Sequence, residues 1–194
     1  MHLESIFSSF LVSDFISVEK ELESYCYNIV STENIRRDDN ITQSGFLDTS
    51  DKNFSNLLSL IEYRFNSLHK DLGLSKSVSQ IVSEYWVNIN LNEKISFPHS
   101  HPNRLFSAVY YVKADKDCGD LVFINPNKVV CQNISDDCIE EYNFYNATHW
   151  KVTPQPGLLI IFPSWLEHYV MPNNSNTDRI SIALNSRMLI NTVT

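Results

Sequence analysis

The chain lacks several features that would place it in a membrane or outside the cell. No stretch approaches the roughly eighteen consecutive apolar residues of a membrane span. Residues 1–20 carry Asp and Glu, without the basic start and the apolar run of a signal peptide. The four cysteines show no C-x-x-C spacing and are Cys26, Cys118, Cys131 and Cys138. We therefore expect a protein without a membrane span in a reducing compartment, the cytoplasm.

Positive charge is also scarce, with 15 Lys and Arg against 23 Asp and Glu and a net charge of −8. Nucleic-acid binders concentrate Lys and Arg on one face, so the composition predicts no nucleic-acid partner. With 194 residues and 43% hydrophobic content, the chain is long enough to bury one substantial core. We expect a single domain over residues 1–194, with helical support in 1–84 and a β core in 85–185. The composition leaves the oligomeric state open.

Two amphipathic segments in the first half of the chain predict helices. Residues 18–30 and 54–72 both place apolar side chains at helical spacing, such as Leu22 and Cys26 in the first and Ile61 and Phe65 in the second. The residues between them, 31–52, are polar and turn-like. We expect both helices to pack on a sheet. A short apolar segment, 6–12, precedes them.

The hydrophobic period changes to two after Tyr85, which is the alternation of half-buried strands. The predicted strands are short, and they cover residues 86–90, 96–101, 106–112, 120–124, 150–153, 157–162, 168–171 and 179–185. Such a series is typical of an all-β sandwich or barrel, and the double-stranded β-helix, or jelly roll, fits the count. The predicted fold is mainly β, with the N-terminal helices packed on the major sheet. Residues 125–149 are too many for a tight hairpin and predict a surface loop.

Three histidines lie where they can share one metal ion. His99 and His101 are two residues apart, and such residues on a strand point to the same face, roughly 7 Å from each other. His168 begins another predicted strand. Non-haem Fe(II) oxygenases hold the metal with a facial set of three ligands, normally two His and one carboxylate. We predict a metal site formed by His99, His101 and His168.

The motifs around these histidines resemble a known family. In order they are H-x-H, S-x-V-Y-Y-V, G-D-L-x-F-x-N-P, P-G-L-L-I-I-F-P-S-W-L-x-H and R-I-S-I-A-L-N. This order resembles the 2-oxoglutarate/Fe(II)-dependent oxygenases of bacteria and phages and, more distantly, the prolyl 4-hydroxylases. The resemblance implies a jelly roll that uses Fe(II), 2-oxoglutarate and O₂ to oxidise a peptide or small-molecule substrate, with release of succinate and CO₂. Asn88 and Asn90, on one face of the strand before H-x-H, are candidates for the substrate side.

Strand parity predicts which side chains bind the cosubstrate. In R-I-S-I-A-L-N, Arg179 and Ser181 share one face, while the Ile and Leu side chains share the other. An Arg that faces the inside of a barrel is costly unless it meets an anion, and a guanidinium matches a carboxylate in bidentate geometry. We expect Arg179 and Ser181 to bind the far carboxylate of 2-oxoglutarate. Tyr111 is the expected phenol donor to the cosubstrate, and Tyr110 should point outward.

One position departs from the resembled enzymes, which usually read H-x-D or H-x-E where this chain has His101. Three neutral imidazoles are chemically reasonable ligands for iron, and imidazole also suits Cu, Ni and Zn. The alternative is a carboxylate from elsewhere. Asp120 and Glu167 are the candidates, and Glu167 is discounted because it would point away from the face of His168. A second function class also stays open, a cupin-like three-histidine protein that either oxidises without 2-oxoglutarate or only binds a ligand. Arg179 favours the first class.

Overall fold

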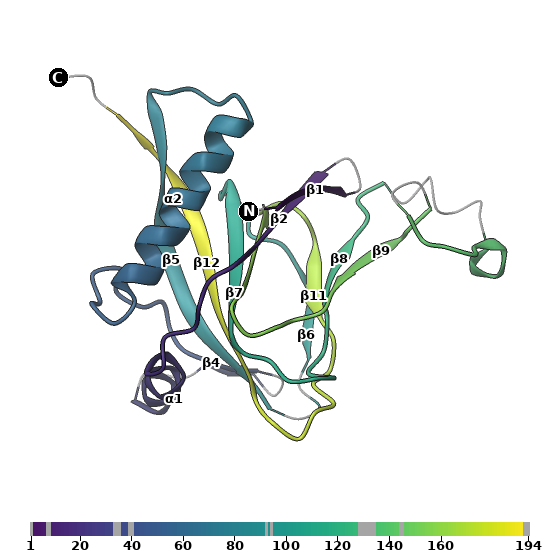
Figure 1. Cartoon of the computed structure of the whole chain (residues 1–194), viewed down its shortest axis with the longest axis horizontal. Helices are drawn as coiled ribbons and strands as arrows, with labels where there is room; N and C mark the ends of the chain where they lie inside the picture. The colour runs from purple at the N-terminus through teal and green to yellow at the C-terminus, as the bar shows by residue number, and fades with distance from the viewer. Residues whose placement is uncertain are drawn as a thin grey trace.

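The computed structural model describes residues 2–6, 9–32, 36–38, 41–91, 93, 95–127, 135–143 and 146–191. Within these ranges the chain forms two sheets and two α-helices (Figure 1). The elements in chain order are β1 (His2–Ile6), β2 (Ser9–Phe15), α1 (Leu22–Thr32), β3 (Arg36–Asp38), β4 (Ile41–Gln43), α2 (Ser55–Asp71), β5 (Val78–Asn90), β6 (Ser96–His99), β7 (Phe106–Lys113), β8 (Leu121–Ile124), the 3₁₀ turn η1 (Asp136–Cys138), β9 (His149–Val152), β10 (Leu158–Pro163), β11 (His168–Val170) and β12 (Arg179–Ile190).

The described strands form an eight-stranded sheet in the order β1-β2-β10-β7-β12-β5-β4-β3 and a four-stranded sheet in the order β6-β11-β8-β9. Neighbouring strands pair antiparallel in both sheets, as the β10–β7 and β11–β8 ladders show. The inner faces meet in one apolar cluster, to which the large sheet contributes Tyr111 and Phe162 and the small sheet contributes Phe123. The predicted mainly β, jelly-roll class is confirmed.

The helices lie on the outer face of the large sheet, away from the small sheet (Figure 1). A second apolar cluster contains side chains of both helices together with Ile180, Ile182 and Leu184 of β12. Within it, the Phe65 ring of α2 stacks on the Phe106 ring of β7, with 5.9 Å between the ring centroids. Among the described residues, no helix is long and apolar enough to cross a membrane. Because the helices cover one face of the large sheet, the opposite face lies toward the small sheet.

The segment 1–84, expected to give helical support, also contributes strands, and that description needs correction. β2 pairs with β10, and β4 pairs with β5. β5 begins at Val78 rather than at residue 86. These strands form because distant parts of the chain offer them partners, and strand propensity in a short segment depends strongly on such context. The helix predicted at 54–72 agrees closely with α2 (Ser55–Asp71).

Two strand ends in the second half of the chain also differ from the prediction. β6 ends at His99, so His101 lies beyond the strand. β12 continues to Ile190, where its last residues pair with the first residues of β5. The predicted loop at 125–149 lies only partly within the described residues, where it contains η1 (Asp136–Cys138). Cys131 lies outside them.

Candidate metal centre and cosubstrate pocket

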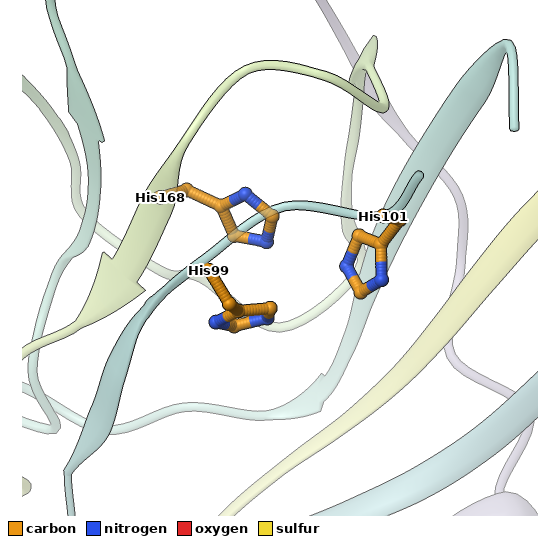
Figure 2. Close-up of side chains that lie close together, drawn as sticks. All are labelled: His99, His101 and His168. Atoms are coloured by element: carbon orange, nitrogen blue, oxygen red, sulfur yellow. The ribbon is translucent and has the colours of Figure 1, made fainter. Parts of the chain in front are cut away.

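Three histidine side chains from the small sheet and the turn after β6 point toward one another (Figure 2). The ring centroids are 4.5 Å apart for His99 and His168, 5.1 Å for His99 and His101, and 5.3 Å for His101 and His168. One candidate ligand atom from each ring lies within 4.8 Å of the other two. In the described part of the chain, no other set of His, Cys, Asp and Glu side chains has this spacing.

Different backbone interactions place the three rings. His99 and His168 are directly opposite each other in the β6–β11 pair. His101 is placed differently, because its backbone N–H donates to the carbonyl oxygen of Ser164 at 2.8 Å, in the turn before β11. The prediction that both residues of H-x-H lie on one strand is therefore wrong, although their side chains do converge.

Hydrogen bonds fix which ring nitrogens are available to a metal. The His168 Nδ1 is 2.9 Å from the carbonyl oxygen of Leu166, and the His99 Nδ1 is 2.7 Å from that of Phe97. A carbonyl only accepts, so each neutral ring carries its proton on Nδ1 and leaves Nε2 free. Burial, with the neighbouring His99, lowers the pKa of His168 to about 3 and that of His101 to about 4. These two rings are neutral at pH 7, which is the form that binds metal.

The structure does not bring a described carboxylate to this cluster. Asp120 lines a different cavity, which is formed with the turn that precedes it. Glu167 is exposed. The candidate donor set is therefore three imidazoles, which fits a first-row metal such as iron but gives the site one negative charge fewer than the usual two-histidine, one-carboxylate set.

A cavity of about 240 Å³ adjoins the three histidines, between the two sheets. The predicted cosubstrate residues Tyr111, Arg179 and Ser181 all line it. So do Asn88 and Asn90, which were predicted on the substrate side. Sequence parity therefore placed the side chains of these strands on the correct face.

Arg179 is a buried cation, with 1% of its surface exposed. Its Nη1 donates to the carbonyl oxygens of Cys118 at 3.2 Å and Gly119 at 2.9 Å, whereas its Nε has no partner. No salt bridge between described residues includes Arg179. Burial lowers its pKa below the usual value, although a guanidinium keeps its charge in proteins. A buried charge without a counter-ion is costly, so the arrangement favours an anionic ligand in the cavity.

Two side chains with hydroxyl groups, Ser181 and Tyr111, line the same cavity as this guanidinium. Ser181 and Tyr111 are register partners in the β12–β7 pair. Burial raises the pKa of Tyr111 to about 12, so its phenol keeps the proton and can donate it in a hydrogen bond. Tyr110 faces the other way, into the cluster beneath the helices, as predicted.

Other side chains that line the cavity were not predicted, among them Trp86, Phe162 and Gln43. The Trp86 ring contacts the His101 ring at 5.7 Å between centroids, and the Phe162 ring contacts the His168 ring at 4.7 Å. Trp86 and Asn88 are two residues apart on β5 and lie on the same face of the strand, so the sequence alone could have predicted that Trp86 lines the cavity. Gln43 comes from β4, inside the segment read as turn-like, and its position depends on pairing with β5.

Solved structures share this fold at low sequence identity. A prolyl-4-hydroxylase from Pseudomonas putida aligns with a TM-score of 0.61 and 16% identity, covering 91% of each chain. An oxidoreductase of the 2OG-Fe(II) oxygenase family from Burkholderia pseudomallei gives 0.61 and 14%, covering 91% of this chain and 83% of that one. HygX from Streptomyces hygroscopicus, solved with nickel, 2-oxoglutarate and hygromycin B, gives 0.60 and 11%, covering 91% and 82%. Curated protein sequences give no match.

A family model described as "Putative 2OG-Fe(II) oxygenase" matches residues 84–185, more than half of the chain. The match begins within β5 and ends within β12, so it includes both the histidine cluster and the cavity. The three-histidine cluster and the uncompensated Arg179 agree with the two groups that such enzymes bind. The chain therefore belongs to the 2OG-Fe(II) oxygenase family, as an oxidoreductase that uses Fe(II) and 2-oxoglutarate.

Proposed function

We propose that the protein is a dioxygenase that hydroxylates a peptide or small-molecule substrate, with release of succinate and CO₂. The observation that carries this proposal is the buried Arg179, which shares one cavity with the three histidines and has no carboxylate partner among the described residues. A dicarboxylate cosubstrate would bring the missing anion to the guanidinium while its other end lies near the histidines.

His99, His101 and His168 are the proposed metal ligands, with Nε2 as the donor atom of His99 and His168. Iron, when bound, supplies the activation of O₂ that couples substrate oxidation to decarboxylation of 2-oxoglutarate. Three protein ligands would leave the other coordination positions of a bound iron open to cosubstrate and O₂. The Trp86 and Phe162 rings pack against two of the histidines and exclude water from that side.

Arg179, Ser181 and Tyr111 are the proposed cosubstrate residues. The guanidinium pairs with the far carboxylate, and the hydroxyl groups of Ser181 and Tyr111 donate to the cosubstrate. In the cupin-like alternative, a three-histidine protein without 2-oxoglutarate, no dicarboxylate cosubstrate supplies an anion to Arg179. Compensation of its buried charge would then depend on a different anion, and for this reason we favour the dioxygenase.

The proposed substrate side is the wall formed by Trp86, Asn88 and Gln43, which all line the cavity. Phe46 is 67% exposed, and its ring contacts that of Trp86 at 5.6 Å between centroids. Aromatic and amide side chains suit a neutral peptide or a small molecule. Both kinds of ligand occur among proteins of this fold, since a prolyl hydroxylase from Trichoplax adhaerens was solved with a peptide fragment and HygX with hygromycin B. A cytoplasmic location and the absence of a nucleic-acid partner stay predictions from composition.

The test is to load the protein with Fe(II) without oxygen, to titrate 2-oxoglutarate by calorimetry, and then to admit O₂ and measure succinate. Slow succinate formation is expected even without substrate. Arg179→Ala should weaken cosubstrate binding by about 2 to 5 kcal/mol, the range for truncating one partner of a buried charge pair, while metal binding persists. Arg179→Lys should rescue only in part, because an ammonium cannot form the bidentate contact. A metal-loaded protein that neither binds 2-oxoglutarate nor forms succinate would support the cupin-like alternative.

A further inference from the structure

Asn90 lies directly opposite Arg179, as its register partner in the β5–β12 pair. Side chains that are paired in this way have Cβ atoms about 4.5 to 5.5 Å apart and lie on the same face of the sheet. Both residues line the cavity beside the histidines, and both are buried, with 2% of Asn90 and 1% of Arg179 exposed. The two side chains therefore share one dry environment.

Each of the two side chains has a buried nitrogen without a hydrogen-bond partner. These atoms are Nδ2 of Asn90 and Nε of Arg179. Leaving a buried donor unsatisfied is unfavourable, so such atoms need an explanation. Both donors belong to side chains that line the same cavity, and one ligand with two acceptor oxygens would satisfy both.

The surrounding contacts hold this pair in place. Asn173, which is fully buried, donates from Nδ2 to the backbone oxygen of Asn90 at 2.9 Å. On the other strand, Nη1 of Arg179 donates to the carbonyl oxygens of Cys118 and Gly119. The backbone of one residue and the guanidinium of the other are thus fixed by groups outside the cavity. Neither contact uses the unsatisfied Nδ2 of Asn90 or Nε of Arg179.

We propose that Asn90 is a cosubstrate-binding residue, and that its Nδ2 and the Arg179 guanidinium together hold the far carboxylate of 2-oxoglutarate. This inference rests on the proposed function and moves Asn90 from the substrate side to the cosubstrate side. Asn88 stays in the proposed substrate wall with its β4 partner Gln43, and its β12 partner Ser181 places it at the border with the cosubstrate residues.

The amide supplies a donor without adding charge. Arg179 already offers the one positive charge that a single carboxylate requires, so a second cation would leave an excess in the dry cavity. An Asp at position 90 would have the opposite effect, because its own carboxylate would pair with Arg179 and repel the dianionic cosubstrate. Asn90→Ala and Asn90→Asp are therefore expected to differ in severity.

The experiment is anaerobic calorimetric titration of 2-oxoglutarate into Fe(II)-loaded variants. Asn90→Ala should weaken binding about ten- to hundred-fold, the range for one lost hydrogen bond to a charged group. Asn90→Asp should weaken it further. Ser79→Ala, in the same strand but outside the cavity lining, is the control and should keep the cosubstrate affinity of the wild type within about two-fold. Thermal unfolding of each variant checks that the fold is intact.

A second ligand tests which end of the cosubstrate Asn90 contacts. 2-Oxobutyrate has the keto acid group but lacks the far carboxylate, so its affinity, measured by competition, should be the same in the wild type and in Asn90→Ala. An equal loss for both ligands would overturn the assignment, since Asn90 would then act on the keto acid end or on the shape of the cavity. Unchanged 2-oxoglutarate affinity in Asn90→Ala, with a loss in Arg179→Ala, would overturn this inference alone. No 2-oxoglutarate binding by the metal-loaded wild type would overturn the proposed function.

Discussion

At the scale of single residues, His168 is the most deeply buried member of the histidine cluster, with 3% of its surface exposed. His168→Ala should reduce metal affinity by more than about 100-fold, because changing even an outer partner of a ligand costs up to that amount. Metal content after reconstitution, measured with a competing chelator, gives the result. Wild-type metal content in a folded His168→Ala protein would contradict the proposed ligand set.

A second buried histidine provides the matched control for this variant. His69 of α2 is 6% exposed, and its ring nitrogens contact the carbonyl oxygen of Ser75 at 2.9 Å and Nε2 of Gln80 at 3.1 Å. It lies outside the histidine cluster. His69→Ala should therefore reduce stability as a lost buried side chain does, while metal binding stays unchanged. The comparison separates the loss of a ligand from the loss of packing.

At the scale of secondary-structure elements, Gly157 joins three strands just before β10. Its oxygen accepts from the N–H of Ile16 after β2, and its N–H donates to the oxygen of Tyr111 in β7, both at 2.8 Å. Its φ is +83°, and a Cβ there would lie 2.5 Å from the oxygen of Ile16. Gly157→Ala should cost about 2 to 4 kcal/mol of unfolding free energy, since both backbone strain and a steric clash result. Chemical denaturation measures this change.

Gly73, which follows α2, allows the cost of backbone strain to be measured separately from the cost of a steric clash. It also has a positive φ, +69°, but a Cβ there would have no atom within 4 Å. Gly73→Ala should cost only about 1 to 2 kcal/mol, the strain of a left-handed conformation. Equal losses of unfolding free energy in Gly157→Ala and Gly73→Ala would show that the backbone near Ile16 moves to relieve the clash at no measurable cost.

The elements also show how far sequence reasoning extends. Parity placed Arg179, Ser181 and Tyr111 on the cavity face because the two-residue period of a strand is a local property. The same reasoning did not find β1 and β2, because β2 depends on pairing with β10, which is remote in sequence, and β1 depends on pairing with β2. It predicted that the histidines converge but misplaced His101, whose position depends on a hydrogen bond to Ser164. The local pattern therefore predicts on which face of a strand a side chain lies, whereas its neighbours depend on pairing with strands that are remote in sequence.

At the scale of the whole molecule, the proposed ligands would connect the two sheets. His99 and His168 belong to the small sheet, whereas Arg179 and Tyr111 belong to the large one. At a 2-oxoglutarate concentration of about 100 times Kd, binding should add about 2.7 kcal/mol to the stability of the metal-loaded protein. For a chain of this size, this corresponds to a rise in Tm of about 5 to 10 °C.

Thermal unfolding under anaerobic conditions, with metal alone and with metal plus 2-oxoglutarate, measures this rise. Arg179→Ala serves as the control, since it should keep the stabilisation by metal and lose the additional stabilisation by 2-oxoglutarate. A rise of the same size in Arg179→Ala would mean that 2-oxoglutarate binds elsewhere.

The position of His101 has an evolutionary consequence. Main-chain atoms hold this residue, through the hydrogen bond from its N–H to Ser164, and it lies after the last residue of β6. The side chain at position 101 is therefore independent of the strand pairing that shapes the small sheet. Mutation can exchange imidazole for carboxylate there, and so alter the charge of the metal centre, while the architecture around it is inherited unchanged.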